Sequence, residues 1–133
     1  MPRAIYVYLL TVPVFFGIDL VWLGAVANGF YRDNLGPLLR PTFNWTVGLI
    51  FYLLFIVGIL VFAVYPAVDR ESAVRALWLG ALFGFFAYSV YDLTNLATIR
   101  DWPLKVSLLD LAWGTVLTAV VSFISYFIAR WVG

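Results

Sequence analysis

Four long apolar runs, separated by short polar breaks, constrain this chain more than any other feature. They cover residues 4–27, 44–65, 74–97 and 104–129 of a chain of 133 residues. A helix needs about 20 mainly apolar residues to cross the hydrocarbon core of a bilayer, and each run is long enough. The sequence therefore predicts an all-α protein with one domain, residues 1–133. Its predicted architecture is an integral membrane bundle of four transmembrane helices with both termini on the same side.

The composition agrees with a membrane location, because 65% of the residues are hydrophobic and only 11% are charged. A soluble domain keeps roughly a quarter of its residues charged, so the outer surface of this chain is expected to face lipid. The net charge of +1 provides no basic field that would attract nucleic acid. The chain has no Cys and no His, which excludes disulfides, zinc–thiolate sites and Cys nucleophiles. No cofactor and no metal site are predicted.

The breaks between the runs have the chemistry of turns. Residues 28–41 hold Asn, Gly, Pro and three charges, and residues 99–103 read "IRDWP", a tight turn. In residues 65–72, Asp69 or Ser72 is expected to cap the next helix. The N-terminal run is too long for the apolar region of a signal peptide, so we interpret it as the first membrane helix. The eight Lys and Arg residues divide equally between the two sides, so the positive-inside rule sets no orientation.

Three of the seven acidic residues fall inside the predicted spans. At about 1.5 Å per residue, Asp19 lies about 12 Å before the end of the first helix and Asp92 about 8 Å before the end of the third. Asp110 lies about 9 Å after the start of the fourth helix. These helix ends reach the same face of the membrane, so the three carboxylates are expected at similar depth in one half of the bilayer. Acidic residues inside a membrane are costly, and a functional role is their default interpretation.

Each of these aspartates is followed, three residues later, by a side chain with an N–H donor on the same helical face. The pairs are Asp19 with Trp22, Asp92 with Asn95, and Asp110 with Trp113. Small and hydroxyl residues at steps of three and four residues predict close helix–helix contacts along the third and fourth helices. These residues are Gly80, Gly84 and Tyr88 in the third helix, and Ser107, Gly114, Thr118, Ser122 and Ser125 in the fourth.

We therefore predict a polar pocket, in one half of the bilayer, that takes up a lipid head group, a cation, another small polar ligand or a proton. Its ligand-binding or proton-binding residues would be Asp19, Asp92, Asp110, Asn95, Trp22, Trp113 and Tyr88, with Arg100 as a counter-charge. The competing interpretation is structural, with Asp–Arg pairs and Asp–Trp hydrogen bonds that hold the bundle together. Carboxylates also suit a hard divalent cation, but their spacing alone does not predict one.

The chain resembles a bacterial membrane protein family, the domain of unknown function 2177, over nearly its whole length. The resemblance rests on three stretches: "IDLVWLGAVANGFYRDNLGPLL", "FYLLFIVGILVFAVYPA" and "GALFGFFAYSVYDLTNLATIRDWPLKVSLLDLAWGTVLT". It implies a multi-pass protein of the bacterial inner membrane. It also implies a lipid-related role, through an association of the family with enzymes that modify fatty acids. It supplies no catalytic residues.

Three classes of function remain open at this point. The first is a binding or accessory protein for a membrane lipid, with lipid-modifying enzymes as partners. The second is a proton-coupled transporter, which with four helices would be a homo-oligomer. Its plan is similar to that of the small multidrug exporters, although those carry a single membrane Glu in the first helix. The third is a membrane enzyme that uses a carboxylate pair for acid–base chemistry.

Overall fold

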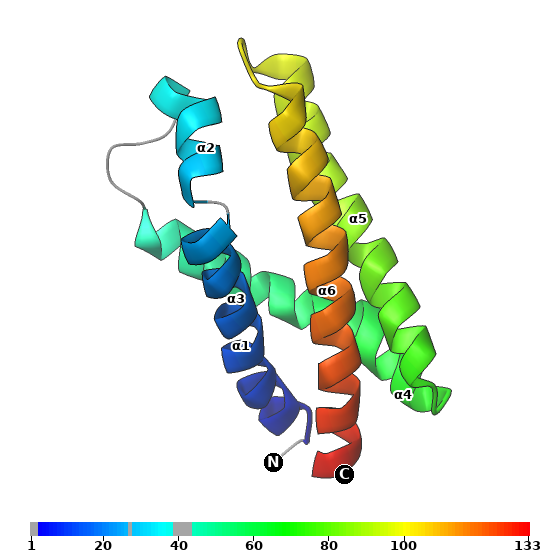
Figure 1. The fold of residues 1–133 in the computed structure, drawn as a ribbon. Helices are drawn as coiled ribbons and strands as arrows, with labels where there is room; N and C mark the ends of the chain where they lie inside the picture. The colour runs from blue at the N-terminus through cyan, green and yellow to red at the C-terminus, as the bar shows by residue number, and fades with distance from the viewer. Residues whose placement is uncertain (1–2, 27, 39–43) are drawn as a thin grey trace.

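The computed structural model describes residues 3–26, 28–38 and 44–133 of the chain. In these residues all regular structure is helical and no strand occurs (Figure 1). Four helical segments are long and apolar enough to cross a membrane: Arg3–Ala25, Trp45–Asp69, Ala73–Thr98 and Leu104–Val132. The predicted all-α fold with four membrane-spanning helices is confirmed.

The first span consists of α1 (Arg3–Val21) and a wider π-helical turn, η1 (Trp22–Val26). A short helix, α2 (Asn28–Leu35), and a 3-10 turn, η2 (Gly36–Leu38), follow it. The sequence predicted only a break between spans in this region. A helix forms here because Leu35 and its neighbours offer an apolar side to the bundle, and Leu35 is buried. Because it lies beyond the first apolar run, α2 is not part of any of the four spans.

The second span is longer than the sequence predicted. α3 (Trp45–Ile59) continues through a π-helical turn, η3 (Leu60–Val64), into α4 (Tyr65–Asp69). The prediction ended this helix at Tyr65, because residues 65–72 carry Pro66 and three charges. Proline is tolerated there because it occupies the first turn of α4, where a missing N–H costs little. In Figure 1 this span crosses behind α1 and α6 at a steep angle.

The third and fourth spans, α5 (Ala73–Thr98) and α6 (Leu104–Val132), lie side by side along most of their length (Figure 1). Ser72 caps α5, because its hydroxyl accepts a hydrogen bond from the backbone N–H of Arg75 at 3.1 Å. Of the two caps that the sequence allowed, Ser72 is therefore the one that is used. A short turn, residues 99–103, connects the two helices as predicted.

Glycines allow α5 and α6 to approach each other closely. A Cβ atom on Gly84 would lie 2.3 Å from the carbonyl oxygen of Gly114 and 2.6 Å from the hydroxyl of Thr118. A Cβ atom on Gly80 would lie 2.4 Å from the hydroxyl of Ser122. These distances leave no room for a side chain. The close helix–helix contact that the small residues predicted is confirmed, and it forms within a single chain.

The apolar core lies where the spans meet, and its largest members are fully buried: Phe15 of α1, Ile56 and Ile59 of α3, and Leu117 of α6. On the outside, large apolar side chains are exposed along all four spans. Such a surface is stable when it faces hydrocarbon, which explains how a chain with few charges can expose so much apolar area.

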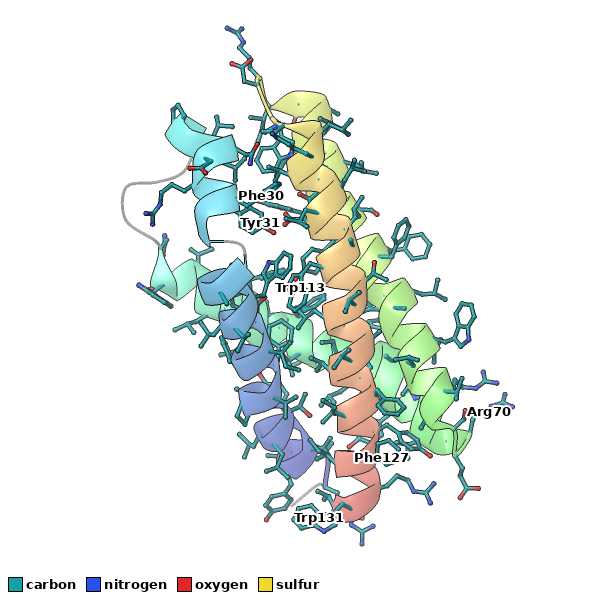
Figure 2. The ribbon with its side chains drawn as sticks, viewed as in Figure 1. Phe30, Tyr31, Arg70, Trp113, Phe127 and Trp131 are labelled. Carbon is teal, nitrogen blue, oxygen red and sulfur yellow. The ribbon has the colours of Figure 1, made fainter. Side chains whose placement is uncertain are left out.

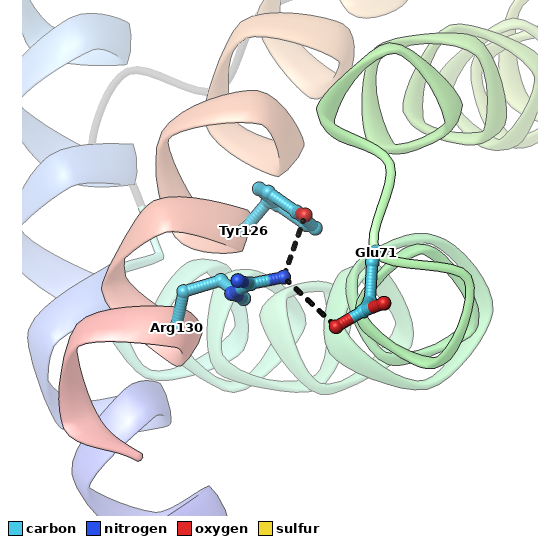
Figure 3. Close-up of polar contacts among 3 residues, drawn as sticks. All are labelled: Glu71, Tyr126 and Arg130. Atoms are coloured by element: carbon cyan, nitrogen blue, oxygen red, sulfur yellow. Dashed lines mark hydrogen bonds and ion pairs between the residues drawn. The ribbon is translucent and has the colours of Figure 1, made fainter.

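The two ends of the chain meet at one end of the bundle (Figure 1), where Arg3 donates a hydrogen bond to the carbonyl oxygen of Gly133 at 2.9 Å. At the same end, Arg130 lies 3.8 Å from Glu71 and donates to the hydroxyl of Tyr126 at 3.3 Å (Figure 3). These contacts connect the end of α6 to the turn before α5. The aspartates of the spans lie at the opposite end of the bundle.

Candidate functional site

The three aspartates of the spans approach one another at the end of the bundle where α1 ends, α5 ends and α6 begins. Asp92 is completely buried, Asp19 is 6% exposed, and Asp110 is half-buried. Asp110 interacts electrostatically with both of the others. The sequence predicted that these residues lie at similar depth, and the structure brings them into one region.

Asp92 and Asp110 form a pair in this region. Their side chains are near enough to each other for a hydrogen bond across the α5–α6 contact. Neither carboxyl oxygen of Asp92 accepts a hydrogen bond from a donor group in the described part of the chain. Ser107 donates to Asp92 at 3.0 Å, but to its backbone carbonyl and not to its side chain. Two ionised carboxylates are both acceptors, so a hydrogen bond between them requires one proton on the pair.

A third residue, Tyr31 of α2, contacts this pair. The sequence did not predict Tyr31 as a site residue. Its hydroxyl donates a hydrogen bond to Oδ1 of Asp110. Burial, and then the hydrogen bond to Asp110, raise the pKa of the Tyr31 phenol above its ordinary value, so the hydroxyl stays protonated and acts as a donor. Figure 2 shows Tyr31 on the side of α2 that faces α6. The four-residue spacing of Tyr31 and Leu35 is the signal that could have revealed an amphipathic helix here.

Asp19 has a different partner from the one that the sequence predicted. The indole N–H of Trp113 donates to Oδ1 of Asp19 at 3.1 Å, so the hydrogen bond runs between α6 and α1. The ring of Trp113 stacks on the ring of Trp22, with centroids 4.3 Å apart and planes 6° apart. The indole N–H of Trp113 is therefore directed to Asp19 of α1 and not to Asp110 of its own helix. The indole N–H of Trp22 is buried and makes no well-formed hydrogen bond within the described residues, but it lies close to the hydroxyl of Tyr31.

Tyrosines from two further helices surround the aspartates. Tyr52 of α3, another residue absent from the predicted site, is close enough to Asp19 for a side-chain hydrogen bond. Tyr88 of α5 lies against Gly114, and its hydroxyl interacts electrostatically with Asp19 and Asp110. The prediction placed Tyr88 beside the aspartates, and the structure does the same.

Two of the predicted site residues lie at the edge of this region. Asn95 lies one turn nearer the end of α5 than Asp92, and its side chain is close to Tyr91. Arg100 is exposed in the α5–α6 turn. The salt bridge found among the described residues joins Arg130 and Glu71. No described Arg or Lys forms one with the three aspartates. Arg40, in the break after the first span, lies outside the described residues.

The region around the three aspartates has no metal-binding geometry among the described residues. It also lines neither of two hollows in the surface. Within the described residues, no three acidic side chains are grouped so that they could hold a metal ion. One hollow lies beside the start of α5, near Arg75 and Trp78. The other is wholly apolar and lies between α1 and the second span, near Tyr8 and Leu60. The aspartates lie among packed aromatic side chains instead.

A comparison with protein-family models identifies residues 4–127 as a match to the family described as "predicted membrane protein (DUF2177)". Comparisons with curated proteins and with solved structures gave no match. The matched segment covers the first span except Arg3, the second and third spans, and most of the fourth. It contains all three aspartates together with Tyr31, Trp22 and Trp113. The resemblance found in the sequence is confirmed, and the chain belongs to the DUF2177 family of predicted membrane proteins.

Proposed function

We propose that the protein binds and releases a proton at the Asp92–Asp110 pair and acts as a proton-coupled protein of the membrane. The observation that supports this proposal best is the complete burial of the Asp92 carboxyl without a donor among the described residues. An ionised carboxylate in such a position would carry a large desolvation cost. Asp92 therefore needs a group that neutralises its charge.

A proton is the neutralising group that this environment accommodates. No described Arg or Lys pairs with the aspartates, and no metal-binding group of acidic residues is present in the described chain. A proton needs no cavity, and it converts the repulsion between two adjacent carboxylates into a hydrogen bond. With one proton on the pair, Asp92 donates to Asp110, and Asp110 accepts from both Asp92 and Tyr31.

Larger ligands fit this environment less well. A lipid head group or another small polar ligand, which the sequence left open, would need space beside the carboxylates. The two surface hollows described above lie elsewhere, at the start of α5 and between α1 and the second span. An enzyme that used the same pair would need to bring its substrate to Asp92, which is fully enclosed. The geometry therefore favours proton exchange.

The membrane, in this proposal, is the inner membrane of a bacterium. Proteins of the bacterial outer membrane cross it as β-barrels, whereas this chain has four candidate spans that are all helical. A voltage across the inner membrane acts on any charge that moves within it, so a buried proton-binding pair could be coupled to that voltage.

The proposal can be tested by infrared spectroscopy of the purified protein in lipid bilayers. We expect the wild type to show the carbonyl band of a protonated carboxylic acid at neutral pH, and Asp92→Asn to lose it. The variant should remain folded, because an amide has the shape of a protonated carboxyl and can still donate to Asp110.

Asp101→Asn is the matched control, since Asp101 is exposed in the α5–α6 turn and the same chemical change there should leave the band intact. Absence of the band from the wild type, or its persistence in Asp92→Asn, would show that the pair does not hold a proton.

A further inference from the structure

We infer that Tyr31 of α2 positions Asp110 and closes the route by which a proton leaves the Asp92–Asp110 pair. This inference rests on the proposed function, because it concerns access to the same pair. It assigns to α2, a helix outside the four spans, the control of exchange with the aqueous phase.

The burial of the two carboxyls defines the route. Asp92 is fully enclosed, so a proton that leaves it must pass to Asp110, which is half-buried. The hydroxyl of Tyr31 occupies a hydrogen-bonding position on Asp110. In this inference Tyr31 limits the access of water to Asp110 from the side of α2.

Several titratable side chains face Asp110 from the surrounding elements. They are Asp19 of α1, Tyr31 of α2, Tyr52 of α3, and Tyr88, Tyr91 and Asp92 of α5. Of these, Tyr31 is the one that makes a hydrogen bond to Asp110 from outside the four spans. In this inference Tyr31 moves with α2, which lies outside the four spans.

α2 also contacts η1, where the Trp22 indole lies close to the Tyr31 hydroxyl, so a movement of Tyr31 would break this contact together with the one to Asp110. The Asn34 side chain of α2 donates to the carbonyl oxygen of Phe30 at 2.8 Å, which is a bond within the helix. Arg32 and Asp33 are exposed. Leu35 anchors the end of the helix by burial, so a small rotation about this end would withdraw Tyr31 from Asp110.

The release of a proton then takes two balanced steps. The O–H bond of Asp92 breaks as an O–H bond forms on Asp110, which leaves Asp92 ionised. When Tyr31 moves aside, a water molecule accepts the proton from Asp110, and the pair carries one more negative charge. Uptake of a proton from water follows the same steps in reverse.

The test is the rate at which the protonated carboxyl band of the pair shifts after transfer of the protein from H₂O to D₂O. We expect Tyr31→Phe to accelerate this exchange by about tenfold or more, the effect of losing a hydrogen bond to a charged group. The band should also change in frequency, because Asp110 loses a donor. Tyr6→Phe is the matched control, since Tyr6 is exposed on α1 at the other end of the bundle. Loss of its hydroxyl should change neither the exchange rate nor the frequency of the band.

An unchanged exchange rate in a folded Tyr31→Phe variant that keeps the band would overturn this inference and leave the proposed function standing. A wild type without the band would overturn both. Unfolding of Tyr31→Phe would also contradict the inference, because it would show that α2 is needed for the stability of the spans.

Discussion

Trp113 connects two spans through a single side chain. Its ring stacks on Trp22, and its N–H donates to Asp19, which is almost fully buried. A buried carboxylate that loses a donor keeps its desolvation cost without compensation. Trp113 should therefore contribute to stability through its hydrogen bond as well as through its ring.

Replacement of Trp113 by Phe tests this hydrogen bond. Phe retains an aromatic ring against Trp22 but has no N–H for Asp19, so we expect the free energy of unfolding to fall by about 1–3 kcal/mol. Thermal unfolding in detergent would measure the change. Trp131→Phe is the control, because Trp131 is 81% exposed and its replacement should have little effect. Equal stability of the two variants would show that the hydrogen bond to Asp19 does not contribute to the free energy of unfolding.

At the scale of the elements, the antiparallel pair of α5 and α6 holds both carboxyls of the proposed proton site. The separation of Asp92 and Asp110 depends on how closely these helices approach, and glycines set that approach. Gly114 lies directly beneath the ring of Tyr88, where a Cβ atom would be 2.3 Å from Cγ of that ring. The base of a ring cannot rotate away as the end of a flexible side chain can.

Gly114→Ala is therefore expected to separate α5 from α6. Overpacking of this kind costs about 1–3 kcal/mol, which exceeds the gain of about 1 kcal/mol from replacing Gly by Ala in a helix. Thermal unfolding again provides the measurement. Gly17→Ala in α1 is the matched control, because nothing lies within 4 Å of its added Cβ atom, and it should be neutral or slightly stabilising. A Gly114→Ala variant as stable as Gly17→Ala would contradict the close contact.

For the whole molecule, the arrangement of the spans fixes which turns share a side of the membrane. α5 runs from the turn that contains Arg70 to the turn that contains Arg100, and both residues are exposed. If α5 crosses the bilayer, these two turns lie on opposite sides. The native chain has no Cys, so single cysteines can report on each position.

A maleimide that cannot cross membranes should label either Arg70→Cys or Arg100→Cys in intact cells, and both after permeabilisation. Leu82→Cys, at an exposed position midway along α5, should resist labelling in both conditions because hydrocarbon excludes the reagent. Labelling of both turn positions from one side would contradict a membrane-spanning α5.

The sequence alone predicted the four spans, because a length of apolar chain sufficient to cross a bilayer is a local property. It also predicted the inward-facing row from Ser107 to Ser125, because helical periodicity decides which residues share a face. It was less accurate at breaks in the pattern. It placed no helix at α2, and it ended the second span at residue 65, where η3 and the position of Pro66 allow the helix to continue.

The position of Asp19, Asp92 and Asp110 at one end of the bundle followed from counting residues along helices. Their partners did not, because a partner on another helix depends on how the helices rotate and cross. Sequence spacing paired Trp113 with Asp110, whereas the stacking of Trp22 and Trp113 turns this indole towards Asp19. The spacing of Tyr31 and Leu35 could indicate the helix α2, but not that Tyr31 reaches Asp110 across the molecule. Thus hydropathy and periodicity determined the spans and the end of the bundle at which their acids lie, while only the tertiary packing decided which donors those acids meet.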